Sequence, residues 1–147
     1  HPQVLRDRRR HAAQFRGGGM MPAVLSVFLG AGLGGVLRYL LGQAVTAFAG
    51  PGFPWGTFVI NVSGCVLMGF LARVIPAPED GGQSLRLLLM TGVLGGFTTY
   101  SAFALDAANL WMRDDIGASL AYVGGTLILC LVGVAIGLSI GRWVAAS

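Results

Sequence analysis

Four long stretches without a charged residue constrain this chain more than any other feature. They are Met20 to Leu37, Phe53 to Ala72, Leu87 to Leu105 and Ile116 to Gly141. Each has the ~18 to 20 residues that a helix needs to cross about 30 Å of hydrocarbon. Lipid offers the backbone no hydrogen-bonding partner, so we expect helices whose interruptions are buried in protein. The sequence therefore predicts an all-α membrane protein with four transmembrane helices.

The composition agrees with a membrane environment. Of the 147 residues, 54% are hydrophobic and 11% are charged, a balance that a soluble domain of this size could not hide from water. The two cysteines, Cys65 and Cys130, both fall inside the apolar stretches and lack metal-ligand spacing, so we expect packing or pore-wall roles. Motifs typical of enzymes, such as HExxH, a P-loop or paired carboxylates, are missing from the sequence. We therefore do not expect an enzyme.

The positive charge is concentrated at the start of the chain. Five of the ten basic residues precede residue 20, and from there five arginines balance five acids. A basic arm beside a first span is typical of a cytoplasmic anchor, and we expect no nucleic-acid partner. We predict that residues 1–19 form a disordered or non-native arm and that residues 20–147 form one transmembrane domain. Met20 or Met21 is then the expected native start.

Polar groups inside a membrane are costly and therefore informative. Asn61 lies in the middle of the second stretch, and Arg38 lies within the expected first helix. In the fourth stretch, polar residues follow one another at i, i+4 and i+8 and so share one helix face. These three residues are Tyr122, Thr126 and Cys130, and Gly133, Gly137 and Gly141 continue the same face.

Each of these features also has a structural explanation. Asn61 can form an interhelical hydrogen bond, Arg38 can reach the membrane surface, and hydroxyls can bond the preceding turn. The glycines are typical of close helix packing. However, all of the polar groups are hydrogen-bond donors, and Asp106 is the only acid inside the expected spans. A lining of this kind favours a small anion.

Two other classes of membrane protein remain open. A small four-helix multidrug exporter needs a membrane-embedded glutamate in its first span, and here there is none. A noncatalytic membrane scaffold would use the glycine faces only to assemble, and replacing Asn61 would then leave no transport phenotype.

Three runs of residues resemble signatures of the Fluc family of small fluoride channels, also called CrcB. They are Gly34 to Tyr39, Gly56 to Asn61 and Gly92 to Phe103, which reads GVLGGFTTYSAF. The likeness covers about residues 22 to 144. It implies passive, fluoride-selective export across the inner (plasma) membrane, which protects against fluoride toxicity. It also implies an antiparallel, dual-topology homodimer with two pores.

The resemblance further implies a broken third helix and a structural sodium ion at the dimer centre. In the family the break falls at the Gly-Gly-x-Thr-Thr segment, so Gly95 and Thr98 would supply backbone carbonyls to Na⁺ from each subunit. Glycines are expected to permit the break. Freed carbonyls at a buried axis would need a cation or another partner.

Carried over residue by residue, the family pattern places six residues along the fluoride pore and Thr57 near it. Amide and hydroxyl donors can replace water around fluoride, and aromatic rings present a positive edge to an anion. Tyr100 stands where phenylalanine is common, and Thr126 and Cys130 stand where serine is common. The pore residues are Asn61, Tyr100, Phe103, Tyr122, Thr126 and Cys130, and the two further functional residues are Arg38 and Thr57.

Overall fold

The computed structural model describes residues 19–146, and four of its helical segments are long and apolar enough to cross a membrane. The first is α2 (Met20–Ala49) and the second is α3 (Trp55–Val74). The third spans Gln83–Met112 in several pieces, and the fourth is α7 (Ile116–Ala145). The predicted all-α membrane architecture is confirmed. The predicted arm lies outside the described residues, apart from Gly19.

The third segment is built from four consecutive pieces. They are α4 (Gln83–Arg86), the π-helix η2 (Leu87–Leu94), α5 (Gly95–Phe97) and α6 (Tyr100–Met112). A π-helix is rare and often marks a functional site. The sequence offered no sign of it.

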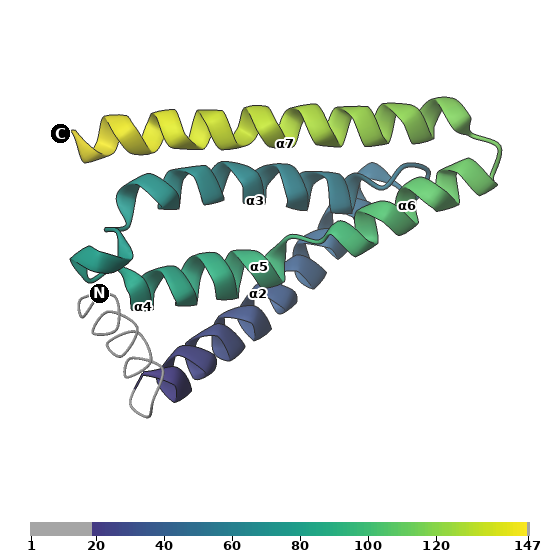
Figure 1. Ribbon diagram of the computed structural model, residues 1–147. Coiled ribbons are helices and arrows are strands. Elements are labelled where there is room, and N and C mark those ends of the chain that lie inside the picture. Colours follow the sequence, from purple (N-terminus) through teal and green to yellow (C-terminus); the bar gives the residue numbers. More distant parts are fainter. Residues whose placement is uncertain (1–18, 147) are drawn as a thin grey trace, which may run out of the picture.

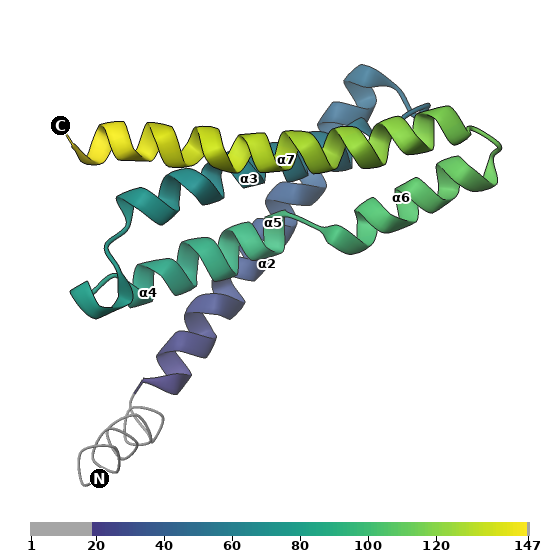
Figure 2. The ribbon, with the colours of Figure 1, turned by 45° about the horizontal axis from the view of Figure 1, so that its top comes forward.

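The two halves of the third segment pack on different helices. The first half, chiefly η2 and α5, lies along α2, whereas α6 lies along α7 (Figure 1). The most extensive helix contact is between α3 and α7, which run side by side in Figure 1; in Figure 2, α7 passes in front of α3. The change of direction between α5 and α6 therefore allows the third segment to pack against two different helices, α2 and α7.

Small residues allow the helices to approach closely. A Cβ on Gly137 of α7 would collide with the carbonyl oxygen of Val66 in α3, and one on Gly34 of α2 would collide with that of Val93. The glycine face predicted on the fourth helix is thus a helix-packing face toward α3. A substitution at Gly137 would force the two backbones apart.

Arg86 fixes the connection between the second and third segments. Its guanidinium donates hydrogen bonds to the carbonyl oxygens of Ala72 at 3.1 Å, Ile75 at 2.8 Å and Pro76 at 2.8 Å. These carbonyls lie at the end of α3, where no further helical turn offers donors. The short 3-10 helix η1 (Pro78–Asp80) occupies part of this connection.

Candidate functional site: the interruption of the third segment and its two cavities

Two residues with extended backbone separate α5 from α6. Thr98 has φ −79° and ψ 157°, and Thr99 has φ −152° and ψ 117°. Both are β-branched, a side-chain type that fits extended backbone better than helix. The Thr99 hydroxyl then accepts a hydrogen bond from the Ala102 amide at 3.2 Å and so caps α6.

The glycines of this segment have a different role from the one expected. Gly95 and Gly96 are helical residues of α5, so the expectation that glycine flexibility permits the interruption is wrong. A Cβ on Gly96 would instead collide with the Ala31 carbonyl of α2. The threonines adopt the extended backbone, while Gly96 provides room for the neighbouring helix.

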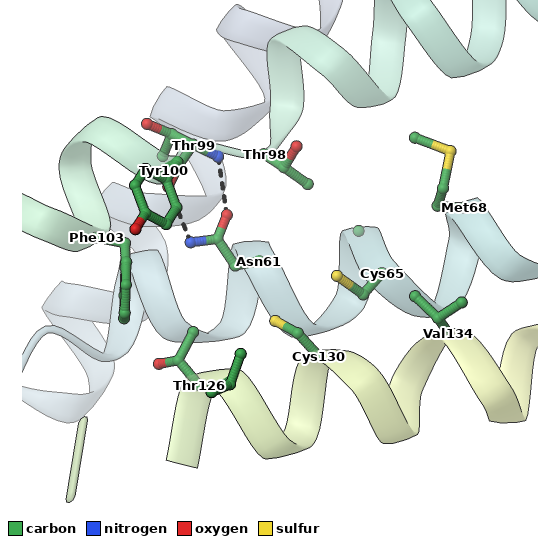
Figure 3. A pocket seen from close by; sticks show the side chains of 12 residues that line it. Asn61, Cys65, Met68, Thr98, Thr99, Tyr100, Phe103, Thr126, Cys130 and Val134 are labelled. Atoms are coloured by element: carbon green, nitrogen blue, oxygen red, sulfur yellow. Dashed lines mark hydrogen bonds between the residues drawn. The ribbon is translucent and has the colours of Figure 1, made fainter. Parts of the chain in front are cut away.

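Asn61 of α3 pairs with the extended backbone in both directions. Its Oδ1 accepts a hydrogen bond from the Thr99 amide at 2.8 Å, and its Nδ2 donates to the Thr99 carbonyl at 3.0 Å (Figure 3). The carboxamide therefore replaces the helical partners that Thr99 lacks. An amide nitrogen carries two hydrogens, so Asn61 retains a second N–H donor.

The Asn61 pairing and the Thr99 cap together draw two backbone amides away from nearby carbonyls. In a continuous helix the Thr99 amide would bond the Gly95 carbonyl, and the Ala102 amide would bond that of Thr98. Here those amides bond Asn61 Oδ1 and Thr99 Oγ1 instead. The Gly95 and Thr98 carbonyls are thus deprived of their usual helical donors, and neutral oxygens of this kind suit a hard cation.

A cavity of about 300 Å³ lies beside the interruption. Most of its lining is apolar, with a few convergent polar groups, which is typical of ligand sites. We call it the Asn61 cavity. Its walls come from α3, the Thr98–Phe103 region and α7, as Figure 3 shows. The lining residues are Asn61, Gly64, Cys65, Met68, Thr98, Thr99, Tyr100, Phe103, Thr126, Leu127, Cys130 and Val134.

Thr126 lines this cavity, and its hydroxyl lacks a hydrogen-bonding partner. Thr126 is 5% exposed, and its Oγ1 is the one buried side-chain oxygen or nitrogen within residues 19–146 that forms no hydrogen bond. Leaving such a group unsatisfied costs about 1 to 3 kcal/mol. A bound species that accepts a hydrogen bond would offset this cost.

Three aromatic rings form a row that begins at the cavity. The Phe103 ring centroid lies 5.6 Å from that of Tyr100 and 5.3 Å from that of Tyr122, and both pairs are tilted. Tyr100 and Phe103 line the Asn61 cavity, whereas Tyr122 is fully buried behind them. Of the predicted stripe on α7, only Thr126 and Cys130 reach this cavity.

A second cavity of about 540 Å³, which we call the Arg38 cavity, also reaches Thr99. Arg38 and Thr57 both line it, and Thr99 lines both cavities. Asp106 also lines it and accepts a hydrogen bond at 3.4 Å from the Tyr122 hydroxyl. The remaining lining residues are Gly35, Tyr39, Gly42, Gln43, Thr46, Pro54, Gly56, Ile60 and Ala102.

Sequence reasoning did not identify Thr99 as a site residue. Thr99 joins the two cavities and pairs with Asn61, but only the folded chain brings α3 against the interruption. Cys65 was expected in a packing or pore-wall role, and it lines the Asn61 cavity. Asp106 was noticeable as the only acid inside the expected spans, which is the signal that could have identified it.

Comparison with known proteins shows the family to which this chain belongs. Residues 25–138 match the family described as CrcB-like protein, Camphor Resistance (CrcB). A protein of Novosphingobium aromaticivorans named fluoride-specific ion channel FluC is 51% identical over 85% of this chain and 100% of its own length. A protein of the same name from Paracoccus denitrificans is 47% identical over 84% of this chain and 97% of its own length.

A third relative has a similar level of sequence identity to this chain. It comes from Rhizobium etli, is also named fluoride-specific ion channel FluC, and is 44% identical over 81% of this chain and 95% of its own length. The family match and these relatives cover nearly all of the four membrane-spanning segments. This chain is a multi-pass membrane protein that belongs to the CrcB family.

Proposed function

We propose that this protein is a fluoride-selective passive channel that exports fluoride across the cell's inner (plasma) membrane. The family match and the names of the relatives support fluoride as the permeating ion. The observation that carries the proposal is the buried, unpartnered hydroxyl of Thr126, a residue that lines the same cavity as Asn61. Two residues with spare hydrogen-bond donors in a mostly apolar cavity suit a small anion.

Fluoride must lose much of its water to enter such a cavity. Burying an ion without compensating hydrogen bonds is very costly, so several donors have to replace the hydration shell. Thr126 offers O–H, Asn61 offers its second N–H, and Phe103 and Tyr100 offer ring edges. Cys130 contributes a weaker S–H donor on the same wall.

A structural sodium ion is the second part of the proposal. The Gly95 and Thr98 carbonyls would hold it, because the donors that they would meet in a continuous helix bond Asn61 and Thr99 instead. A cation at this position supplies positive charge that favours an anion in the neighbouring cavity. The residues of the chain itself still provide the contacts to fluoride.

We further propose that the channel works as an antiparallel homodimer. Tyr100 is 82% exposed and Gly95 is exposed, although both lie at the interruption, deep within a membrane-spanning segment. A polar hydroxyl and unpaired carbonyls are unfavourable against lipid. A second copy of the chain that covers this face would shield them and bring two Gly95–Thr98 segments together.

Fluoride efflux from reconstituted vesicles tests the function directly. Purified protein in liposomes loaded with potassium fluoride and supplied with a potassium ionophore should release fluoride to an external fluoride electrode. Parallel vesicles loaded with potassium chloride should retain chloride, because a larger, more weakly hydrogen-bonding anion does not offset the loss of its water here. Protein-free liposomes are the background control. Retained fluoride, or equal release of both anions, would contradict the proposal.

Phe103→Ile is expected to slow fluoride efflux about tenfold. Isoleucine keeps an apolar side chain but loses the ring edge, whose interactions are worth about 0.5 to 1.5 kcal/mol. The matched control is Phe58→Ile, since Phe58 packs against Trp55 with ring centroids 5.8 Å apart and lines neither cavity. Equal efflux from the Phe103→Ile variant and the unmodified protein would remove Phe103 from the path.

A further inference from the structure

The two cysteines of this chain meet on the wall of the Asn61 cavity. Cys65 comes from α3 and Cys130 from α7, and both line the cavity. Their thiols lie within interaction range of each other, and both are free (Figure 3). The sequence places them 65 residues apart with no metal-ligand spacing, so only the packing of α3 on α7 creates the pair.

The helices that carry the two thiols are in direct backbone contact and cannot move closer together. Gly137 of α7 lies directly against the Val66 backbone, and Gly69 of α3 lies directly against the Val134 backbone. Both contacts are within two turns of the cysteines, so the backbone positions of the pair are fixed. Sites carried on rigid helices hold their ligands more precisely than sites on loops.

We propose that Cys65 and Cys130 form a two-coordinate site for a soft monovalent cation of the copper(I) and silver(I) class, and that a cation bound there obstructs the Asn61 cavity. Soft thiolate ligands select copper(I) over the hard cations that carbonyl oxygens prefer. The site is therefore chemically distinct from the carbonyls of Gly95 and Thr98.

The binding step involves no change of oxidation state. Each thiol loses its proton to water, two S–H bonds break, and two sulfur–metal bonds form. Two thiolates and one monovalent cation leave a net charge of −1 on the cavity wall, which Thr126 and Asn61 also line. This charge, together with the bulk of the metal, opposes the entry of an anion. The obstruction rests on the proposed function, whereas the binding does not.

A third sulfur in the cavity provides a matched control. Met68 also lines the Asn61 cavity, but its thioether points away from the two thiols and the side chain packs against the apolar cluster of Ile60, Leu94 and Phe97 (Figure 3). Met68→Leu is therefore expected to leave the cation affinity unchanged, although it removes a soft ligand from the same wall.

Copper(I) binding to the purified, intact protein in detergent tests the site without any transport measurement. Anaerobic titration against a coloured copper(I) chelator should give one copper(I) per chain. Cys65→Ser and Cys130→Ser should each lower the affinity by about 100-fold or more, because even changes outside the ligand shell cost 10- to 100-fold. Reversible methylthiolation of the folded, unmodified protein should abolish binding, and reductant should restore it. Binding that survives either serine variant or methylthiolation would overturn the proposed site.

Efflux measurements then test the obstruction. Silver(I) in chloride-free medium should stop fluoride efflux from vesicles that contain the unmodified protein or Met68→Leu. For each serine variant, the fluoride efflux rate with silver(I) is compared with the rate of the same variant without it. Silver(I) should not change either rate. Copper(I) binding without silver block would overturn the obstruction and would also exclude the Asn61 cavity from the fluoride path. Absence of copper(I) binding would overturn the site and leave fluoride conduction unaffected.

Discussion

Asn61→Asp should lower the fluoride efflux rate by about 1,000-fold, the largest effect that we expect from a single substitution. Two like unit charges about 4 Å apart repel each other by about 4 kcal/mol at an effective dielectric constant of about 20. Each 1.36 kcal/mol corresponds to a factor of ten in rate. The carboxylate would also lose the hydrogen bond that the Asn61 Nδ2 atom donates to the Thr99 carbonyl at 3.0 Å.

The control for this substitution is Ser63→Ala on the same helix. The Ser63 hydroxyl bonds the carbonyls of Val59 and Ile60 within α3, and the residue lines neither cavity. The fluoride efflux rate of the Ser63→Ala variant should match that of the unmodified protein. Size-exclusion chromatography of the Asn61→Asp variant would show whether the assembly survives. An intact assembly with unchanged fluoride efflux would remove Asn61 from the conduction path.

Thr126→Val is expected to slow fluoride efflux about 10- to 100-fold while the protein remains as stable as before or becomes more stable. Valine has nearly the shape of threonine but lacks the hydroxyl. A hydrogen bond to a charged group contributes about 1.5 to 3 kcal/mol, and this sets the expected loss of rate. The unpartnered Oγ1 costs free energy in the empty cavity, so its removal should not lower the free energy of unfolding.

Two measurements together check the Thr126 prediction. Efflux should recover in Thr126→Ser, which restores the hydroxyl. The thermal unfolding midpoint of Thr126→Val should equal or exceed that of the unmodified protein. A lower midpoint with unchanged efflux would show that the hydroxyl has only a structural role.

Much of the fold follows from local features of the sequence. The four charge-free stretches predicted four spans, and four helical segments of the structure are long and apolar enough to cross a membrane. These predictions succeeded because the requirement to span hydrocarbon acts on each segment separately. The expectation that glycines permit the interruption was wrong, because Gly95 and Gly96 are helical and Gly96 instead allows a close helix contact; glycine is compatible with both uses.

The chemistry of the candidate site could also be predicted in part from the sequence alone. Asn61, Thr126 and Cys130 are polar residues in apolar surroundings, and such residues are costly enough in a membrane to indicate function. Arg38 and Asp106 could be identified for the same reason, but nothing in their sequence positions indicated that they share a cavity. A cavity is formed by several segments, and no single segment encodes it.

The sequence by itself determined that this chain spans a membrane four times and carries several hydrogen-bond donors but only one acid, Asp106, in its spans. Only the tertiary structure decided that Asn61 replaces the helical partners of Thr99, that Thr126 is left without a partner, and that Cys65 meets Cys130. Hydrophobicity is a property of each segment, whereas a hydrogen bond or a thiol pair requires two atoms at a fixed distance. That distance is set by how closely the glycine faces allow the helices to pack.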